Sequence, residues 1–178
     1  MIKIHDKIFV PYLSEAEIQH NITRLATQIN ADYAGKETLF LPILNGAFIF
    51  AADLVRKLDF APEIQFVKIS TYNNSMESSQ SVKNVFGLEN LNLTGKHILI
   101  TEDIVDTGFT VDFLIDFLQK YEPASIKVIA LLYKPDSFKG KTPPHYAAFE
   151  IPSAFVVGYG LDYAQRGREL KEIYVLAN

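Results

Sequence analysis

The amino-acid sequence predicts an α/β protein, with a central and mostly parallel sheet flanked by helices. Apolar runs that fit buried strands alternate with segments of helical period. The second half gives the order strand, helix, strand at residues 97–101, 110–121 and 126–133, and this order implies a right-handed crossover between parallel strands. The 178 residues, 48% of them hydrophobic, contain no repeat or low-complexity linker, so we expect one domain over residues 1–178.

The first expected helix has a clear beginning. Ser14 and Glu17 have the spacing of a capping box, in which each side chain binds a backbone N–H of the other residue. An apolar face then repeats at Ile18, Ile22, Leu25 and Ile29.

The other elements follow from the same kind of pattern. We expect a strand at Thr38–Leu44, a helix at 47–57 and a strand at 64–71, and later strands at 155–157 and 172–176. The helix at 110–121 should bury one apolar side, formed by Val111, Leu114, Ile115 and Leu118. Residues 72–83 are polar and have no apolar period. They fit a solvated connection, although a loop of this length inside a compact domain is often functional.

Composition excludes several classes of protein. The net charge of −4 argues against a duplex nucleic-acid partner, which would require a basic face. Without cysteine there is no disulfide, thiolate metal site or cysteine nucleophile. Residues 1–14 lack the pattern of a signal peptide, and no stretch approaches the roughly 20 apolar residues of a membrane span. We therefore expect a soluble, cytoplasmic protein without a membrane partner.

The most informative segment is 98–110, where a buried strand leads through acidic and hydroxyl residues to a helix. In a parallel sheet this turn lies at the carboxyl edge, where ligands bind. Backbone N–H groups of residues 106–110 and the hydroxyls of Thr107 and Thr110 form an anion cradle suited to a phosphate monoester. Gly108 allows a close approach of the backbone.

Glu102 and Asp103 require a different explanation, because carboxylates beside a phosphate would repel it. They are suited to accepting hydrogen bonds from ribose hydroxyls, or to binding a divalent cation between themselves and the ligand. Each acidic dipeptide alone could be a turn or helix cap. The joint pattern of strand, Glu-Asp, two aliphatic residues and Asp-Thr-Gly-x-Thr is much less common.

This pattern closely resembles the phosphoribosyl pyrophosphate (PRPP) motif of type I phosphoribosyltransferases. The hypoxanthine-guanine subfamily is the most similar, and the resemblance extends from about Leu41 to the C-terminus. It implies a small hood, built from the terminal segments, over the central sheet. It also implies that Glu102 and Asp103 hold the ribose hydroxyls and that Asp106 is the catalytic acid/base beside the purine N7. The 5-phosphate is then bound by Asp106, Thr107, Gly108, Phe109 and Thr110.

Other segments match the same family. Leu44, Asn45 and Gly46 resemble its pyrophosphate loop, which contains a cis peptide, and Arg168 matches an arginine that helps to bind pyrophosphate. Thr71 and Tyr72 match the start of its mobile lid. The resemblance further implies a purine site and a Mg²⁺ site: the purine is bound by Lys134, Phe155, Val156 and Asp162, and the metal by Glu102, Asp103 and Asp162.

Two positions depart from the family, which commonly has Lys or Arg at position 45 and often Lys at position 109. Asn45 and Phe109 bring no charge there, so we expect the pyrophosphate loop to act through its backbone amides.

The resemblance implies transfer of the phosphoribosyl group from PRPP to hypoxanthine, and to guanine, with Mg²⁺ as cofactor in a homodimer or homotetramer. A transferase for xanthine or another base stays open. An aspartyl phosphatase fits less well, because its Asp-x-Asp-x-Thr pattern needs a two-residue spacing and Asp103 and Asp106 are three apart. A PRPP-binding gene regulator would carry an additional DNA- or RNA-binding element, and the sequence shows no such element.

Overall fold

The central sheet has the strand order β6-β5-β3-β7-β8-β9 in the computed structural model, which describes residues 1–72, 82–89 and 92–177. Its strands are β3 (Thr38–Leu44), β5 (Val67–Tyr72), β6 (Val82–Phe86), β7 (His97–Val105), β8 (Ser125–Tyr133) and β9 (Tyr146–Glu150), with the short β4 (Glu63–Ile64) beside β3. Pairs β3–β5, β3–β7, β7–β8 and β8–β9 are parallel, whereas β5 and β6 are antiparallel. The predicted α/β class is confirmed.

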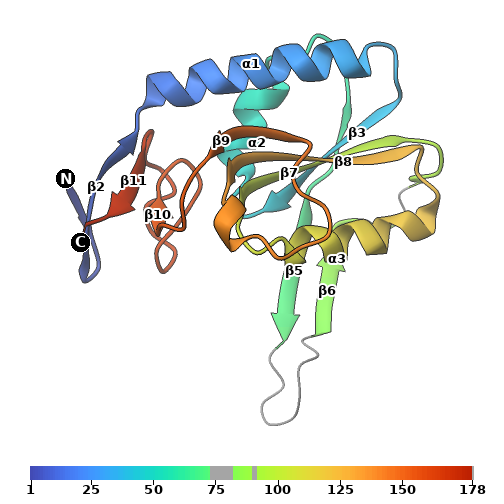
Figure 1. The fold of residues 1–178 in the computed structure, drawn as a ribbon. Helices are drawn as coiled ribbons and strands as arrows, with labels where there is room; N and C mark the ends of the chain where they lie inside the picture. Colours follow the sequence, from blue (N-terminus) through green and yellow to red (C-terminus); the bar gives the residue numbers. More distant parts are fainter. Residues whose placement is uncertain (73–81, 90–91, 178) are drawn as a thin grey trace.

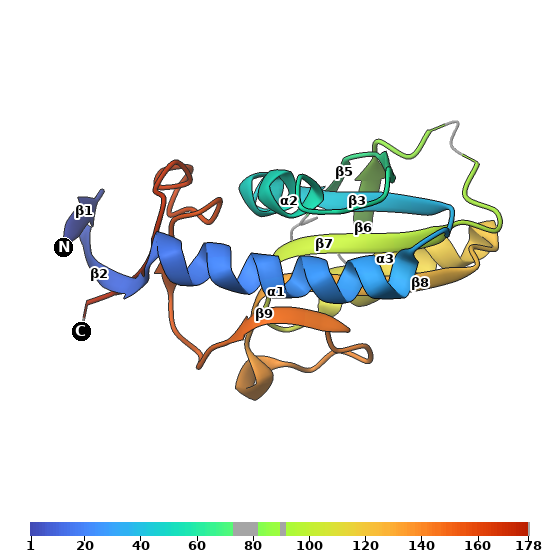
Figure 2. The same cartoon turned by 90° about the horizontal axis from the view of Figure 1, so that it is seen from above.

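Helices cover both faces of this sheet (Figures 1 and 2). Helices α1 (Glu15–Tyr33) and α2 (Phe48–Val55) share one apolar core with the sheet, and α3 (Phe109–Leu118) packs in a second core on the opposite face. The predicted capping box is present, because Ser14 Oγ accepts from the Glu17 N–H at 3.3 Å and the Glu17 carboxylate accepts from the Ser14 N–H at 2.9 Å. The predicted inner faces of α1 and α3 are buried.

A second, antiparallel sheet joins the two ends of the chain (Figure 1). Its order is β1 (Ile2–Ile4), β2 (Lys7–Leu13), β11 (Ile173–Leu176) and β10 (Val156–Val157). This is the hood of terminal segments that the resemblance implied. The hairpin of β1 and β2 was not among the predicted elements, and neither were β6 and β9. Strand β6 begins at Val82, inside the segment 72–83 that was expected to be a connection.

Several boundaries differ from the expectations. The strand expected at 64–71 is divided into β4 and β5, and the helix expected at 47–57 is shorter. The helix expected at 110–121 ends at Leu118 and is continued by a 3-10 turn, Gln119–Tyr121. The strand expected to end at 101 continues as β7 to Val105, because its pairing with β8 extends to the partners Val105 and Tyr133. No helix in the described part of the chain is both long and apolar enough to cross a membrane.

Candidate active site

The predicted phosphate loop lies between β7 and α3, at the carboxyl edge of the sheet. Gly108 is the N-cap of α3 and has a left-handed backbone, φ 84°. A Cβ there would lie 2.3 Å from Cε2 of Phe138. Both its conformation and its contact therefore require glycine at this position.

A small pocket of about 100 Å³ opens at this loop. It contains five of the residues predicted to hold ribose and phosphate, and its lining is Glu102, Ile104, Val105, Asp106, Thr107, Gly108, Thr110 and Val111. Free backbone N–H groups at the start of a helix attract anions, so this pocket is suited to the phosphate that the resemblance assigns to it. The Phe109 side chain is 53% exposed and does not line it.

A larger pocket of about 260 Å³ lies beside the first. It brings together all four residues predicted to bind the purine, and its lining is Asp103, Ile104, Asp106, Lys134, Phe155, Val156, Leu161 and Asp162. Ile104 and Asp106 line both pockets. Asp106 thus stands where a ligand in one pocket would meet a ligand in the other.

Lys134 and Asp106 form an ion pair in the larger pocket. Lys134 Nζ donates to Asp106 Oδ2 at 2.7 Å, and the lysine is only 8% exposed. Its backbone N–H donates to the carbonyl of Val105 at 3.0 Å, which fixes the end of β8 against the end of β7. An ammonium buried to this degree requires a carboxylate partner, so Lys134 is not an ordinary surface lysine.

Glu102 and Asp103 are consecutive residues of β7 and line different pockets, as expected for neighbours on a strand. Burial, followed by the charge of Asp103, raises the pKa of Glu102 well above its ordinary value. Glu102 Oε2 is buried and has no hydrogen-bond partner among the described residues. Burial also raises the pKa of Asp103 to about 6, although the Ile104 N–H and the charge of Arg168 oppose this shift. Both carboxylates therefore favour a ligand that donates hydrogen bonds or carries positive charge.

The predicted pyrophosphate loop contacts Asp103 and the segment 160–168. The peptide bond between Leu44 and Asn45 is cis, as the resemblance implied. A Cβ on Gly46 would lie 1.7 Å from Asp103 Oδ2, and one on Gly160 would lie 2.1 Å from the Gly46 carbonyl oxygen. The backbone can pack this closely because both positions are glycine.

Arg168 and Asp162 are bound to each other beside this loop. Arg168 Nη2 lies 2.6 Å from Asp162 Oδ1, and Nη1 donates to the Gly160 carbonyl at 2.7 Å. The second Asp162 oxygen accepts from the Gln165 N–H at 2.7 Å. Asn45, by contrast, is exposed.

The structure does not gather the three predicted metal ligands in one place. Asp103 and Asp162 line the larger pocket and Glu102 the smaller one. Over the described ranges, no three His, Cys, Asp or Glu side chains lie close enough together to hold an ion. Two carboxylates in one pocket nevertheless suit Mg²⁺, which commonly takes one or two protein carboxylates together with phosphate oxygens and water.

Most of the segment predicted to be a lid lies outside the described residues. Thr71 and Tyr72 are the last residues of β5, and their backbone partners in β6 are Lys83 and Val82. Residues 73–81 lie outside the described residues.

Sequence reasoning missed the aromatic surroundings of Phe155. Its ring is 45% exposed, and its centroid lies 5.7 Å from that of Tyr163 and 6.0 Å from that of Phe9. Phe9 belongs to the unpredicted strand β2. Residues 7–13 form a short apolar run, which is a weak signal for such a strand because Pro11 interrupts it.

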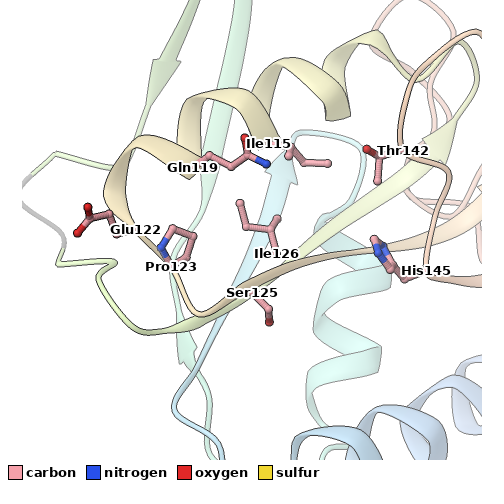
Figure 3. Close-up of a pocket in the computed structure, with 8 residues that line it drawn as sticks. All are labelled: Ile115, Gln119, Glu122, Pro123, Ser125, Ile126, Thr142 and His145. Carbon is pink, nitrogen blue, oxygen red and sulfur yellow. The ribbon is translucent and has the colours of Figure 1, made fainter.

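A further pocket, of about 340 Å³, lies elsewhere, beside the C-terminal end of α3 and the start of β8 (Figure 3). Its lining is Ile115, Gln119, Glu122, Pro123, Ser125, Ile126, Thr142 and His145. None of the predicted site residues is among them. Burial and the nearby charge of Lys127 lower the pKa of His145, which disfavours its charged form.

Comparison with known proteins identifies the class to which this fold and site belong. Residues 12–164 match the model of the phosphoribosyl transferase domain, and the chain belongs to the phosphoribosyltransferase family.

Within this family the chain belongs with the hypoxanthine and hypoxanthine-guanine phosphoribosyltransferases. It is 40% identical over 164 residues to the hypoxanthine-guanine phosphoribosyltransferase of Bacillus subtilis, covering 92% of this chain and 91% of the relative. It is also 40% identical over 161 residues to the hypoxanthine phosphoribosyltransferase of Haemophilus influenzae, covering 89% of each. A solved hypoxanthine-guanine phosphoribosyltransferase from Bacillus anthracis matches with a TM-score of 0.84 and 34% identity, over 97% of this chain and 99% of that one.

Proposed function

We propose that this protein is a purine salvage enzyme that transfers the 5-phosphoribosyl group from PRPP to hypoxanthine, and to guanine. The products are the purine nucleoside monophosphate and pyrophosphate. The named relatives, alike over nearly their whole length, support the activity. The two adjoining pockets support the assignment of its parts.

The position of Asp106 is the main structural support for the proposal. It lines both pockets and forms an ion pair with the buried Lys134. We assign the sugar phosphate to the small pocket and the purine to the large one. The bond that forms, from the purine N9 to C1 of the ribose, then lies beside the Asp106 carboxylate.

Three residues of the large pocket have distinct tasks in this scheme. Lys134, a donor with no acceptor, pairs with the purine 6-oxygen. The Phe155 ring stacks on the base, and Asp106 takes the purine proton as N9 displaces pyrophosphate from C1. A carboxylate beside the ribose also stabilises the positive charge that develops on the sugar.

Asp103 and Asp162 are the carboxylates that would hold Mg²⁺, together with oxygens of PRPP. The ion would supply charge neutralisation for the leaving pyrophosphate. Arg168 lies against Asp162 and can contribute a second positive charge there.

A test of this assignment is Asp106→Asn, assayed with PRPP, Mg²⁺ and hypoxanthine. General acid/base catalysis typically contributes about 10²–10⁴-fold, so turnover should fall by that order while PRPP binds nearly as in the wild type. Single-turnover rates and equilibrium titration separate the two quantities. Wild-type rates in a variant whose chemical step limits turnover would contradict the role of Asp106.

We also propose a homo-oligomer. Phe48, Ile64 and Phe66 are 42%, 48% and 45% exposed and line one apolar pocket of about 180 Å³. Exposed apolar side chains grouped in this way favour association. Sedimentation velocity should give a mass above the 20.1 kDa of one chain, and a monomer at assay concentrations would oppose this part of the proposal.

A further inference from the structure

A buried tyrosine joins three elements behind the pyrophosphate loop. The Tyr159 hydroxyl donates to Asp53 Oδ2 at 2.5 Å, and Gln19 Nε2 donates to the same oxygen at 2.6 Å. Asp53 lies on α2, Gln19 lies on α1, and Tyr159 follows β10. Tyr159 is 3% exposed and lines neither pocket of the site.

The backbone at Tyr159 adopts an unusual conformation. Its φ is 51°, and its neighbours Gly158 and Gly160 both have φ 102°. A left-handed backbone is costly for a residue with a Cβ and persists where the surroundings hold it. Here the Tyr159 N–H donates to the Leu170 carbonyl and the Gly160 N–H donates to the Arg168 carbonyl, both at 2.9 Å.

These contacts connect the two parts of the proposed pyrophosphate site. Gly46 ends the loop and α2 begins at Phe48, so Asp53 and the loop are parts of one continuous segment. Gly160 packs on the carbonyl of Gly46, and Arg168 donates to the carbonyl of Gly160 at 2.7 Å. The Tyr159–Asp53 hydrogen bond therefore joins this segment to the one that carries Arg168.

We propose that Tyr159 is a positioning residue for the pyrophosphate half of the site, with Asp53 as its acceptor and Gln19 as a second donor to that carboxylate. By holding α2, it sets the loop 44–46 at a fixed distance from Arg168. The inference rests on the proposed function, because it assigns pyrophosphate to this loop. A hydrogen bond to a carboxylate is stronger than a neutral one, which suits a contact that must hold two segments in register.

The test is Tyr159→Phe, which removes the hydroxyl and keeps the ring. Loss of a charge-assisted hydrogen bond should weaken the binding of pyrophosphate with Mg²⁺ by roughly tenfold. Binding of inosine monophosphate, which fills the purine and sugar-phosphate pockets, should stay within about twofold of the wild type. Isothermal titration gives both constants.

Tyr146→Phe is the matched control. Tyr146 also donates to an aspartate, Asp32 Oδ2 on α1, at 2.6 Å, and it begins β9 at the opposite end of that strand from the site. Tyr146→Phe should lower thermal stability without changing the dissociation constant of pyrophosphate or of inosine monophosphate. Asp53→Ala should weaken pyrophosphate binding as Tyr159→Phe does, and Asp53→Asn should weaken it less. The double variant Asp53→Ala with Tyr159→Phe should lose less binding free energy than the sum of the two single losses.

Three results distinguish the possibilities. If the wild type binds neither PRPP nor pyrophosphate, the proposed function itself fails. If the wild type binds both and Tyr159→Phe binds pyrophosphate equally well, the positioning role is wrong. Equal weakening of pyrophosphate and inosine monophosphate would also overturn it, because the hydroxyl would then support the whole site and not one half.

Discussion

At the scale of single residues, the ion pair of Lys134 and Asp106 would connect recognition of the base to its chemistry in the proposed function. The lysine that would meet the purine 6-oxygen is also, at 2.7 Å, the partner of the carboxylate that would move the purine proton. A base with a 6-oxygen gives the ammonium a second acceptor, whereas adenine presents an amino group there and leaves a donor facing a donor. In the proposed function Lys134 would therefore both select the base and hold the Asp106 carboxylate in place.

Lys134→Gln should reduce this selection. A site built on a buried polar match can discriminate by about 10⁴-fold, so the wild type should use hypoxanthine and nearly ignore adenine. An amide can turn either a donor or an acceptor to the base. The variant should therefore have a lower kcat/KM for hypoxanthine and a smaller difference in kcat/KM between hypoxanthine and adenine. The quantity to compare is the ratio of kcat/KM for the two bases. An unchanged ratio would mean that another residue selects the base.

Asp103 makes stability depend on pH. Its pKa in the folded protein is about 6, above the ordinary 3.8, so the folded state holds the proton more tightly than the unfolded state. The free energy of unfolding should therefore fall as the pH rises from about 4 to above 6, by roughly 1–3 kcal/mol from this group.

Asp103→Asn should remove this part of the dependence and stabilise the protein at pH 7.5, while it weakens binding of PRPP with Mg²⁺. Urea unfolding at pH 5 and 7.5 measures the first effect and titration the second. Asp116→Asn, at a side chain that is 61% exposed, is the control and should change neither. A variant at position 103 that is less stable at both pH values would show that the carboxylate is compensated in the free protein.

At the scale of elements, the junction of β7 and α3 forms the small pocket to which we assign the sugar phosphate. Gly108→Ala should be destabilising for two reasons, since φ is 84° and the new Cβ would lie 2.3 Å from the Phe138 ring. Gly35→Ala isolates the first reason, because Gly35 has φ 71° but a Cβ added there would meet no atom within 4 Å.

The backbone cost alone is about 1–2 kcal/mol, so Gly35→Ala should lose about that much and Gly108→Ala clearly more. Urea unfolding compares the two, and only Gly108→Ala should also weaken PRPP binding. Equal losses in stability would mean that Phe138 moves aside without cost.

The elements that the sequence predicted best are those with a local signal. The capping box at Ser14 and the apolar face that follows it predicted α1. The strand predicted at Thr38–Leu44 is present as β3 with the same bounds. Strand β7 was predicted too short, because Glu102 and Asp103 have the polarity of a loop. Their strand conformation comes from pairing with β8, which is a non-local interaction.

At the scale of the whole molecule, the site forms where two sheets meet. Asp106 and Lys134 directly follow β7 and β8 of the central sheet. Phe155 directly precedes the hood strand β10, which begins at Val156. The resemblance implied that Asp106 meets both the phosphate and the purine, and Asp106 does line both pockets. It did not imply that Glu102 and Asp103 are divided between them. The Tyr159–Asp53 bond joins residues 106 positions apart, and no local pattern contains such a contact.

Nucleotide formation is the most direct test of the proposed function. The wild-type protein is incubated with PRPP and Mg²⁺ and, in separate reactions, with hypoxanthine, guanine, xanthine or adenine. Nucleoside monophosphate and pyrophosphate are quantified together, and PRPP binding is titrated in parallel. We predict equal amounts of the two products with hypoxanthine, and with guanine, and almost none with adenine. Tight binding of PRPP without any nucleotide, whichever base is added, would contradict the proposed function and would point to a PRPP-binding regulator instead.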